Sequence, residues 1–87
     1  MKKIKKFEQP TVIEFVVNGR TKKWYRPTVS HDELILLAFS FISVKDYHVY
    51  TITYLHGENG AGGSLTKGDK ISIVPGMIFN IAVTNRA

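Results

Sequence analysis

The sequence predicts an α+β fold in which one helix lies across one face of a mixed sheet of about five strands. Three observations lead to this fold class. Only residues 30–42 have the pattern of a helix of useful length. Ahead of them, the dipeptide Asn18-Gly19 separates two strand-like runs, which predicts a β-hairpin. Three further strand-like runs follow the helix, so the predicted order is ββαβββ.

The hairpin comes first. Strand 11–17 begins after Pro10, which cannot donate to a ladder, and its alternation places Ile13, Phe15 and Val17 inward. Asn18-Gly19 suits the two positive φ values of a type I′ turn. In the return strand, residues 20–26, we expect Trp24 to point inward and the lysines outward, and Pro27 ends the strand.

The predicted helix begins with the pattern S-x-x-E of a capping box. The side chains of Ser30 and Glu33 would satisfy backbone donors at the first turn. At about 100° per residue, one stripe faces the sheet; it consists of Leu34, Leu37, Ala38 and Phe41, with Ile42 at its edge. Leu36 and Phe39 fall on the opposite face, where residues 45–47 would cover them unless they form a second contact surface.

Three strands are predicted after the helix. Residues 48–55 place Tyr50, Ile52 and Tyr54 on one face, residues 70–74 contain Ile71 and Ile73, and residues 77–84 contain Phe79, Ile81 and Val83. A glycine-rich loop spans residues 56–64, Leu65 plugs the core edge, and turns are expected at residues 67–69 and 75–76. The helical crossover allows a later strand to run parallel to the first. This order matches the β-grasp plan of ubiquitin-like proteins.

Length and composition set the outer limits. The 87 residues form one domain, which we place at residues 11–84, between a flexible basic tail at residues 1–10 and a C-terminal tail at residues 85–87. No apolar run approaches the length of a membrane helix, and no signal-peptide core follows the first lysines. The chain has no cysteine, which excludes disulfides and thiol catalysis and fits a cytoplasmic protein.

The net charge of +5 is concentrated in two clusters. The first is Lys2, Lys3, Lys5 and Lys6; the second is Arg20, Lys22, Lys23 and Arg26. Such density is compatible with nucleic-acid binding, or with solubility and attraction to an acidic partner. Because there is neither an RNA-reading aromatic signature nor a groove-entering helix, the second interpretation is favoured.

Motifs for catalysis and for cofactors are missing from the sequence. His31, His48 and His56 lack the i, i+4 spacing of a metal site, and no nucleophile is positioned beside them. The glycine-rich loop lacks the Gly-Lys-Ser/Thr ending of a phosphate-binding loop. We therefore expect no catalytic residue, no metal and no cofactor. The outward sheet face instead offers an apolar patch for a protein partner, made of Val12, Val16, Ile78 and Ala82.

Several motifs together resemble one family. They are F-x-V-N-G at residues 15–19, Trp24 with Pro27, L-x-x-L-A at residues 34–38, Y-T-I-T-Y at residues 50–54, and the block from Gly63 to Ile81. The chain from Thr11 to Thr84 resembles the bacterial ubiquitin-like proteins of the multiubiquitin type. These are encoded beside homologues of activating enzymes, conjugating enzymes and peptidases.

The resemblance implies a protein modifier, activated at its C-terminus and conjugated to targets, and not an enzyme. In such families a ThiF-like activating enzyme adenylates the C-terminal carboxylate with ATP, and glycines keep the tail narrow enough to enter the partner's active site. Here the tail is Thr84, Asn85, Arg86 and Ala87, without Gly-Gly. Three alternatives stay open. A processing peptidase trims the tail to Asn85, another terminal residue is used directly, or the domain is a non-conjugated binding module for protein or nucleic acid.

Overall fold

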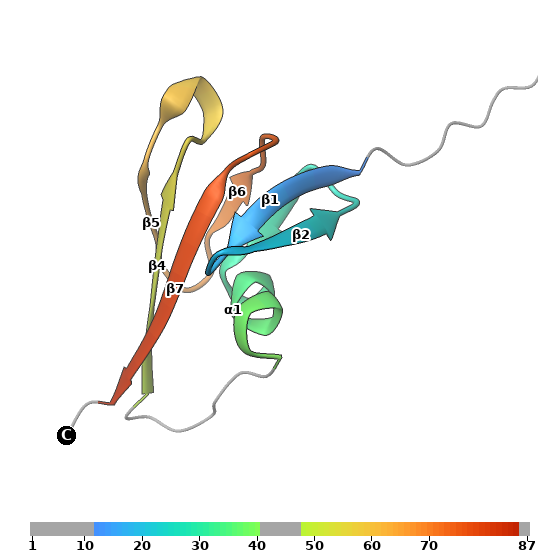
Figure 1. The fold of residues 1–87 in the computed structure, drawn as a ribbon. Coiled ribbons are helices and arrows are strands. Elements are labelled where there is room, and N and C mark those ends of the chain that lie inside the picture. The colour runs from blue at the N-terminus through green and yellow to red at the C-terminus, as the bar shows by residue number, and fades with distance from the viewer. Residues whose placement is uncertain (1–11, 41–47, 86–87) are drawn as a thin grey trace, which may run out of the picture.

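The computed structural model describes residues 12–40 and 48–85. Two sheets and one helix make up this part of the chain (Figure 1). The elements are β1 (Ile13–Val17), β2 (Arg20–Trp24), β3 (Thr28–Ser30), α1 (His31–Phe39), β4 (His48–Leu55), the 3₁₀ turn η1 (Glu58–Gly60), β5 (Gly63–Leu65), β6 (Lys70–Ser72) and β7 (Ile78–Asn85).

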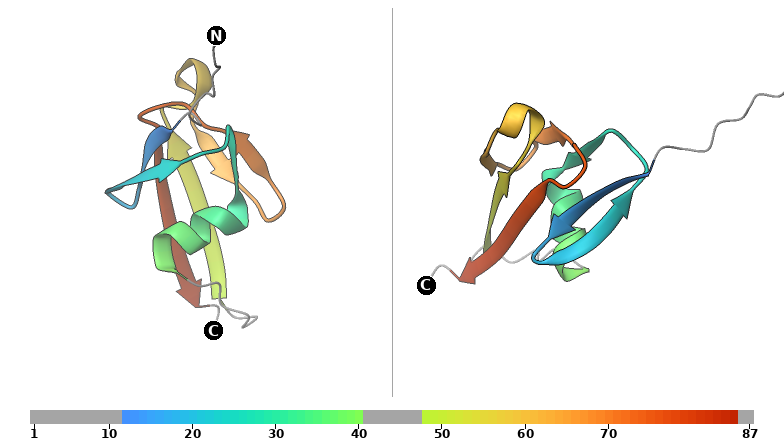
Figure 2. Two further views of the ribbon diagram at one scale, coloured as in Figure 1. Left: turned by 90° about the vertical axis from the view of Figure 1, so that its right-hand side faces the viewer. Right: turned by 45° about the horizontal axis from the view of Figure 1, so that its top comes forward.

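The larger sheet has the order β2-β1-β7-β4-β5, and β3 pairs with β6 in a separate two-stranded sheet. β1 runs parallel to β7, while the other pairs are antiparallel. In Figure 2 (left), α1 crosses in front of β4 and β7. The predicted α+β, ubiquitin-like β-grasp fold with a five-stranded mixed sheet is therefore confirmed.

The hairpin forms for the reason the sequence indicated. Asn18 and Gly19 have φ values of 51° and 80°, as a type I′ turn requires. Phe15 and Val17 are buried, and Phe15 meets the Trp24 ring edge-on at 6.5 Å between ring centres. The return strand ends at Trp24 and not at Arg26, because the Trp24 indole N–H donates to the carbonyl of Thr28 at 2.9 Å and the chain turns there.

One prediction about this hairpin is wrong. The register pairs Lys22 with Phe15, so Lys22 lies on the core side of β2, half-buried, while Lys23 points outward. The pleat allows only alternate residues to share a face, and Trp24 and Lys22 are two positions apart. Since Trp24 points inward, Lys22 must do so too.

The helix is capped as expected, but it is shorter. Ser30 Oγ accepts from the backbone N–H of Glu33 at 3.1 Å, and Glu33 Oε1 accepts from the N–H of Ser30 at 2.9 Å. The helix ends at Phe39 and not at residue 42, because Ser40 adopts φ 71° and donates its N–H to the carbonyl of Leu36.

The buried face of α1 differs from the predicted stripe. Leu34 is buried as predicted, but its buried neighbours are His31 and Ile35, whereas Leu37 and Ala38 are only half-buried. Phe39 is not on a free surface either, because it is half-buried against the Tyr50 ring at 6.1 Å. Leu36 alone matches the predicted outer face, at 46% exposed. Phe41, Ile42 and residues 45–47 lie outside the described residues.

The later strands follow the predicted alternation with three differences. β5 takes the last two residues of the predicted glycine-rich loop, and its pairing with β4 buries Leu65. β6 ends at Ser72 and not at residue 74. Ile52, Phe79 and Ile81 are buried as expected, but Val83 is 42% exposed, because β7 there has passed the end of β1.

Candidate functional site

The sheet face opposite α1 carries a row of apolar side chains. Val16 of β1 is the register partner of Ile78 of β7, and Ile78 is in turn the partner of Leu55 of β4. Directly paired residues share a face, so the three side chains lie side by side across three strands. We call these three residues the outer patch. Val16 and Ile78 are half-buried, and Leu55 is 52% exposed.

A shallow pocket adjoins the outer patch. It encloses about 320 Å³ and is lined by Glu14, Phe15, Val16, Thr21, Pro75 and Gly76. The turn at Pro75 and Gly76 is held against β1, because the Gly76 N–H donates to the Glu14 carbonyl at 2.9 Å and Gly76 takes φ +83°. The pocket extends the outer patch toward the turn before β7.

The four residues proposed from the sequence for a partner surface are distributed unevenly. Val16 and Ile78 are adjacent. Val12 and Ala82 are exposed on the same face, but Glu14 separates Val12 from Val16, and Asn80 separates Ala82 from Ile78. Leu55 was missed. Its signal was present, because it continues the outward alternation of Thr51 and Thr53 in β4.

The middle of β7 is braced by a side chain. Asn18 donates its backbone N–H to the Phe79 carbonyl at 3.0 Å, as the last rung of the parallel ladder. Its side-chain amide then adds another rung. Nδ2 donates to the Ile81 carbonyl at 3.0 Å, and Oδ1 accepts the Ile81 N–H at 2.8 Å. Asn18 thus replaces one residue of a strand and fixes β7 at Ile81.

Beyond Ile81, the described residues pair β7 with β4 alone. Thr84 is paired with Val49, and Asn85 with His48. Figure 1 shows this two-stranded ribbon extending past the hairpin. On its helix side, Phe39 of α1 packs against Tyr50 of β4. The predicted tail therefore starts on a strand, with Thr84 exposed. Arg86 and Ala87 lie outside the described residues.

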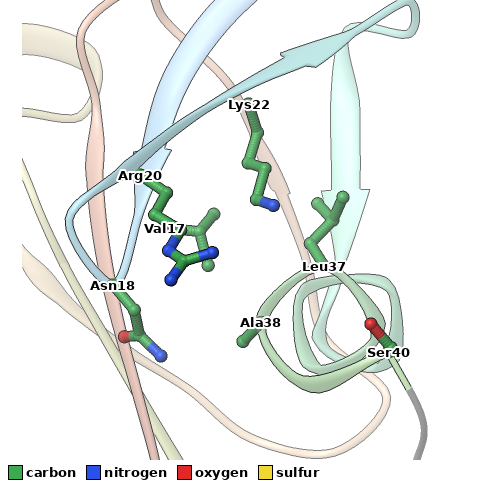
Figure 3. A pocket seen from close by; sticks show the side chains of 7 residues that line it. All are labelled: Val17, Asn18, Arg20, Lys22, Leu37, Ala38 and Ser40. Carbon is green, nitrogen blue, oxygen red and sulfur yellow. The ribbon is translucent and has the colours of Figure 1, made fainter.

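The second basic cluster of the sequence is divided by the fold. Arg26 donates to Glu33 at 2.6 Å and lies over the Trp24 ring at 4.7 Å from its centre. Lys23 is on the outer face, and Arg20 and Lys22 are on the core side. Arg20 and Lys22 border a second pocket, between β2 and α1, with Asn18, Leu37 and Ala38 (Figure 3). These cations do not form one continuous face.

The two carboxylates whose pKa is lowered make structural hydrogen bonds, Glu33 in the helix cap and Asp69 in the turn before β6. Burial alone raises the pKa of Glu33, but the Ser30 N–H and the Arg26 charge lower it more, so its pKa lies below the ordinary 4.5. The N–H and hydroxyl of Thr66 lower the pKa of Asp69. His31 is buried with Nδ1 3.0 Å from Asp32 Oδ1.

Within residues 12–40 and 48–85, no three His, Asp or Glu side chains form a metal-binding group. The one α-helix described there is too short to cross a membrane.

Comparison with known proteins identifies a family. A family model described as Multiubiquitin matches residues 13–85, from the start of β1 to the end of β7. Searches of curated proteins and of solved structures found no significant match.

Proposed function

The chain belongs to the multiubiquitin family, and from that premise we propose that it is a bacterial ubiquitin-like protein modifier with no catalytic site of its own. Two observations support the proposal. One is the family match, and the other is the end of β7, where Thr84 and Asn85 lie past the end of β1 and, among the described residues, pair with β4 alone. A segment that must enter another enzyme's active site needs this kind of access.

The proposed chemistry takes place in a partner. A ThiF-like activating enzyme binds the domain, and a carboxylate in the segment following Thr84 attacks the α-phosphorus of ATP. Pyrophosphate leaves. A cysteine of the conjugating-enzyme homologue or a target nucleophile then attacks the acyl carbon of the adenylate, and AMP is released as the modifier is transferred. A companion peptidase exposes the reactive carboxylate where trimming is needed. The chain's own contribution is positioning. The Asn18 amide fixes β7 at Ile81, and β4 holds the strand from there to Thr84.

We assign recognition of these partners to the outer patch. Its three side chains are apolar and contiguous across β1, β7 and β4, and the pocket beside Val16 gives them a recess. An exposed apolar patch of this kind is typical of a protein-binding surface.

Activation can be tested with the ThiF-like enzyme encoded nearest to the gene. Versions of the chain ending at Asn85, Arg86 and Ala87 are each incubated with ATP and this enzyme, with and without the companion peptidase. We expect at least one version to release pyrophosphate and to gain the mass of an adenylate or a covalent adduct. Free-chain mass and no pyrophosphate for every version would contradict the modifier function.

The same assay distinguishes partner binding by the outer patch from the chemical reaction at the tail. Leu55→Glu and Ile78→Glu should raise the KM of the activating enzyme for this chain, while Thr51→Glu, also exposed on the same sheet face, should not. Circular dichroism checks that each variant is folded. If a partner binds the outer patch but no version of the tail reacts, the alternative function applies, which is a non-conjugated protein-binding module.

A further inference from the structure

The edge strand β2 carries two cations, Arg20 and Lys22, on the side of the sheet that faces the hydrophobic core. Arg20 is paired with Val17 and Lys22 with Phe15, and both partners are buried. Arg20 and Lys22 therefore occupy the helix-facing side of the sheet, where the alternation of β1 has apolar residues. Figure 3 shows both side chains reaching into the space between the hairpin and α1.

That space is a pocket of about 380 Å³. Val17, Leu37 and Ala38 give it an apolar floor, and Asn18, Arg20, Lys22 and Ser40 give it a polar border. Because most of the lining residues are polar and two of them are cations, charge and not apolar area dominates what this pocket can select.

The positive charge of the pocket is not neutralised by the described residues. None of the ion pairs formed within residues 12–40 and 48–85 includes Arg20 or Lys22. The helix carboxylates Asp32 and Glu33 are in the first turn, whereas the pocket is at the last turn. The helix C-terminus offers only about half a negative charge against two cations. The pocket is thus complementary to carboxylates.

The edge of β2 supplies a second recognition element. In a two-residue hairpin the residues flanking the turn are hydrogen-bonded to each other, so Arg20 and Lys22 bond to β1 through their backbone. The N–H and C=O groups of Thr21 and Lys23 then point out of the sheet, since β2 is at the end of the strand order. These groups can pair with an added strand.

We propose that the pocket between β2 and α1 binds an extended acidic segment of a partner protein. The segment pairs with the edge of β2 through Thr21 and Lys23, places carboxylates on Arg20 and Lys22, and packs apolar side chains on Leu37 and Ala38. The binding is non-covalent and does not depend on the proposed conjugation. Two structural roles compete with it. Inward-pointing charges discourage edge-to-edge aggregation, and cations stabilise a helix C-terminus. Neither role requires a ligand.

The test uses the full chain, ¹⁵N-labelled, and a capped seven-residue peptide. In the peptide, positions 1 and 3 are valine, positions 5 and 7 are glutamate, and positions 2, 4 and 6 are threonine. A matched peptide has glutamine for glutamate, and inorganic phosphate serves as a bare anion. We expect the acidic peptide to shift the amide signals of Thr21, Lys23, Leu37 and Ala38. The glutamine peptide should bind at least about tenfold more weakly, because two charge-assisted hydrogen bonds are lost.

Variants then separate the two recognition elements. Arg20→Gln with Lys22→Gln should weaken the acidic peptide by about tenfold. The control Lys70→Gln, exposed on β6 and outside this pocket, should change its affinity less than about twofold. Thr21→Pro removes the edge N–H without breaking the β1–β2 ladder and should abolish binding. The proposal is overturned if the acidic peptide does not bind at millimolar concentration, if phosphate binds as tightly at the same residues, or if the shifts lie on the outer patch.

Discussion

Asn18 provides the sharpest test of how the middle of β7 is held at Ile81. Replacing Asn18 by glycine keeps the positive φ that the turn needs but removes both hydrogen bonds to Ile81. A part-buried hydrogen bond contributes about 0.5–1.5 kcal/mol net, so the loss of two should lower the free energy of unfolding by about 1–3 kcal/mol. For a domain of this size, a loss of about 2 kcal/mol lowers the Tm by about 8–16 °C.

Two further substitutions resolve the contributions. Asn18→Ala should cost more than Asn18→Gly by about 1 kcal/mol, because alanine is strained at φ 51°. Asn18→Asp keeps an acceptor for the Ile81 N–H but turns its other oxygen toward the Ile81 carbonyl, so its stability should fall as well.

Thermal unfolding measures the global effect, and hydrogen exchange at the Ile81 amide measures the local one. In Asn18→Gly this amide should exchange faster than the amides of β7 that are paired with β4, such as that of Asn80. Unchanged protection of Ile81 together with an unchanged Tm would refute the bracing role of Asn18. A lower Tm with normal Ile81 protection would locate the effect in the turn instead.

Three other outcomes are expected. Ile35→Ala should lower the free energy of unfolding by about 2–5 kcal/mol in urea titrations, and the half-exposed Leu36→Ala should change it by less than about 1 kcal/mol; equal losses would contradict the observed buried face of α1. The folded pKa of Glu33 lies below 4.5, so the stability that ionised Glu33 contributes is fully present above pH 4.5 and is lost as the pH falls through the lowered folded value. Urea midpoints of Glu33→Gln should therefore depend less on pH in that acidic range than those of the parent chain. Gly19→Ala meets no neighbouring atom but must hold φ +80°, so its Tm should fall by an amount equivalent to about 1 kcal/mol, and a change much larger than that would point to a steric clash.

Much of the fold could be predicted because its signals are local. The I′ turn at Asn18-Gly19 depends on the φ preferences of two residues, and the capping box on side chains three positions apart. The alternation in β1, β4 and β7 identified Phe15, Ile52 and Phe79 as core residues, and all three are buried.

The candidate site was less accessible from the sequence. Leu55 joins the outer patch only because the β4–β7 register places it beside Ile78. The sequence contains the alternation of each strand but not the register between strands 23 positions apart in the chain. The inward position of Lys22 follows from the alternation that Trp24 sets in β2, although its charge by itself favours an outward position.

The sequence by itself determined where the chain turns, where α1 begins, and which alternate residues of each strand share a face, because those properties depend on neighbours a few positions away. Only the tertiary structure decided which face of α1 is buried. Residues 34–39 are all apolar, so the helix could turn several sides to the sheet, and packing selected Leu34 and Ile35 over Leu37. Tertiary structure also decided that the Asn18 amide reaches Ile81, 63 residues away, since a contact of that range exists only after β1 and β7 have paired.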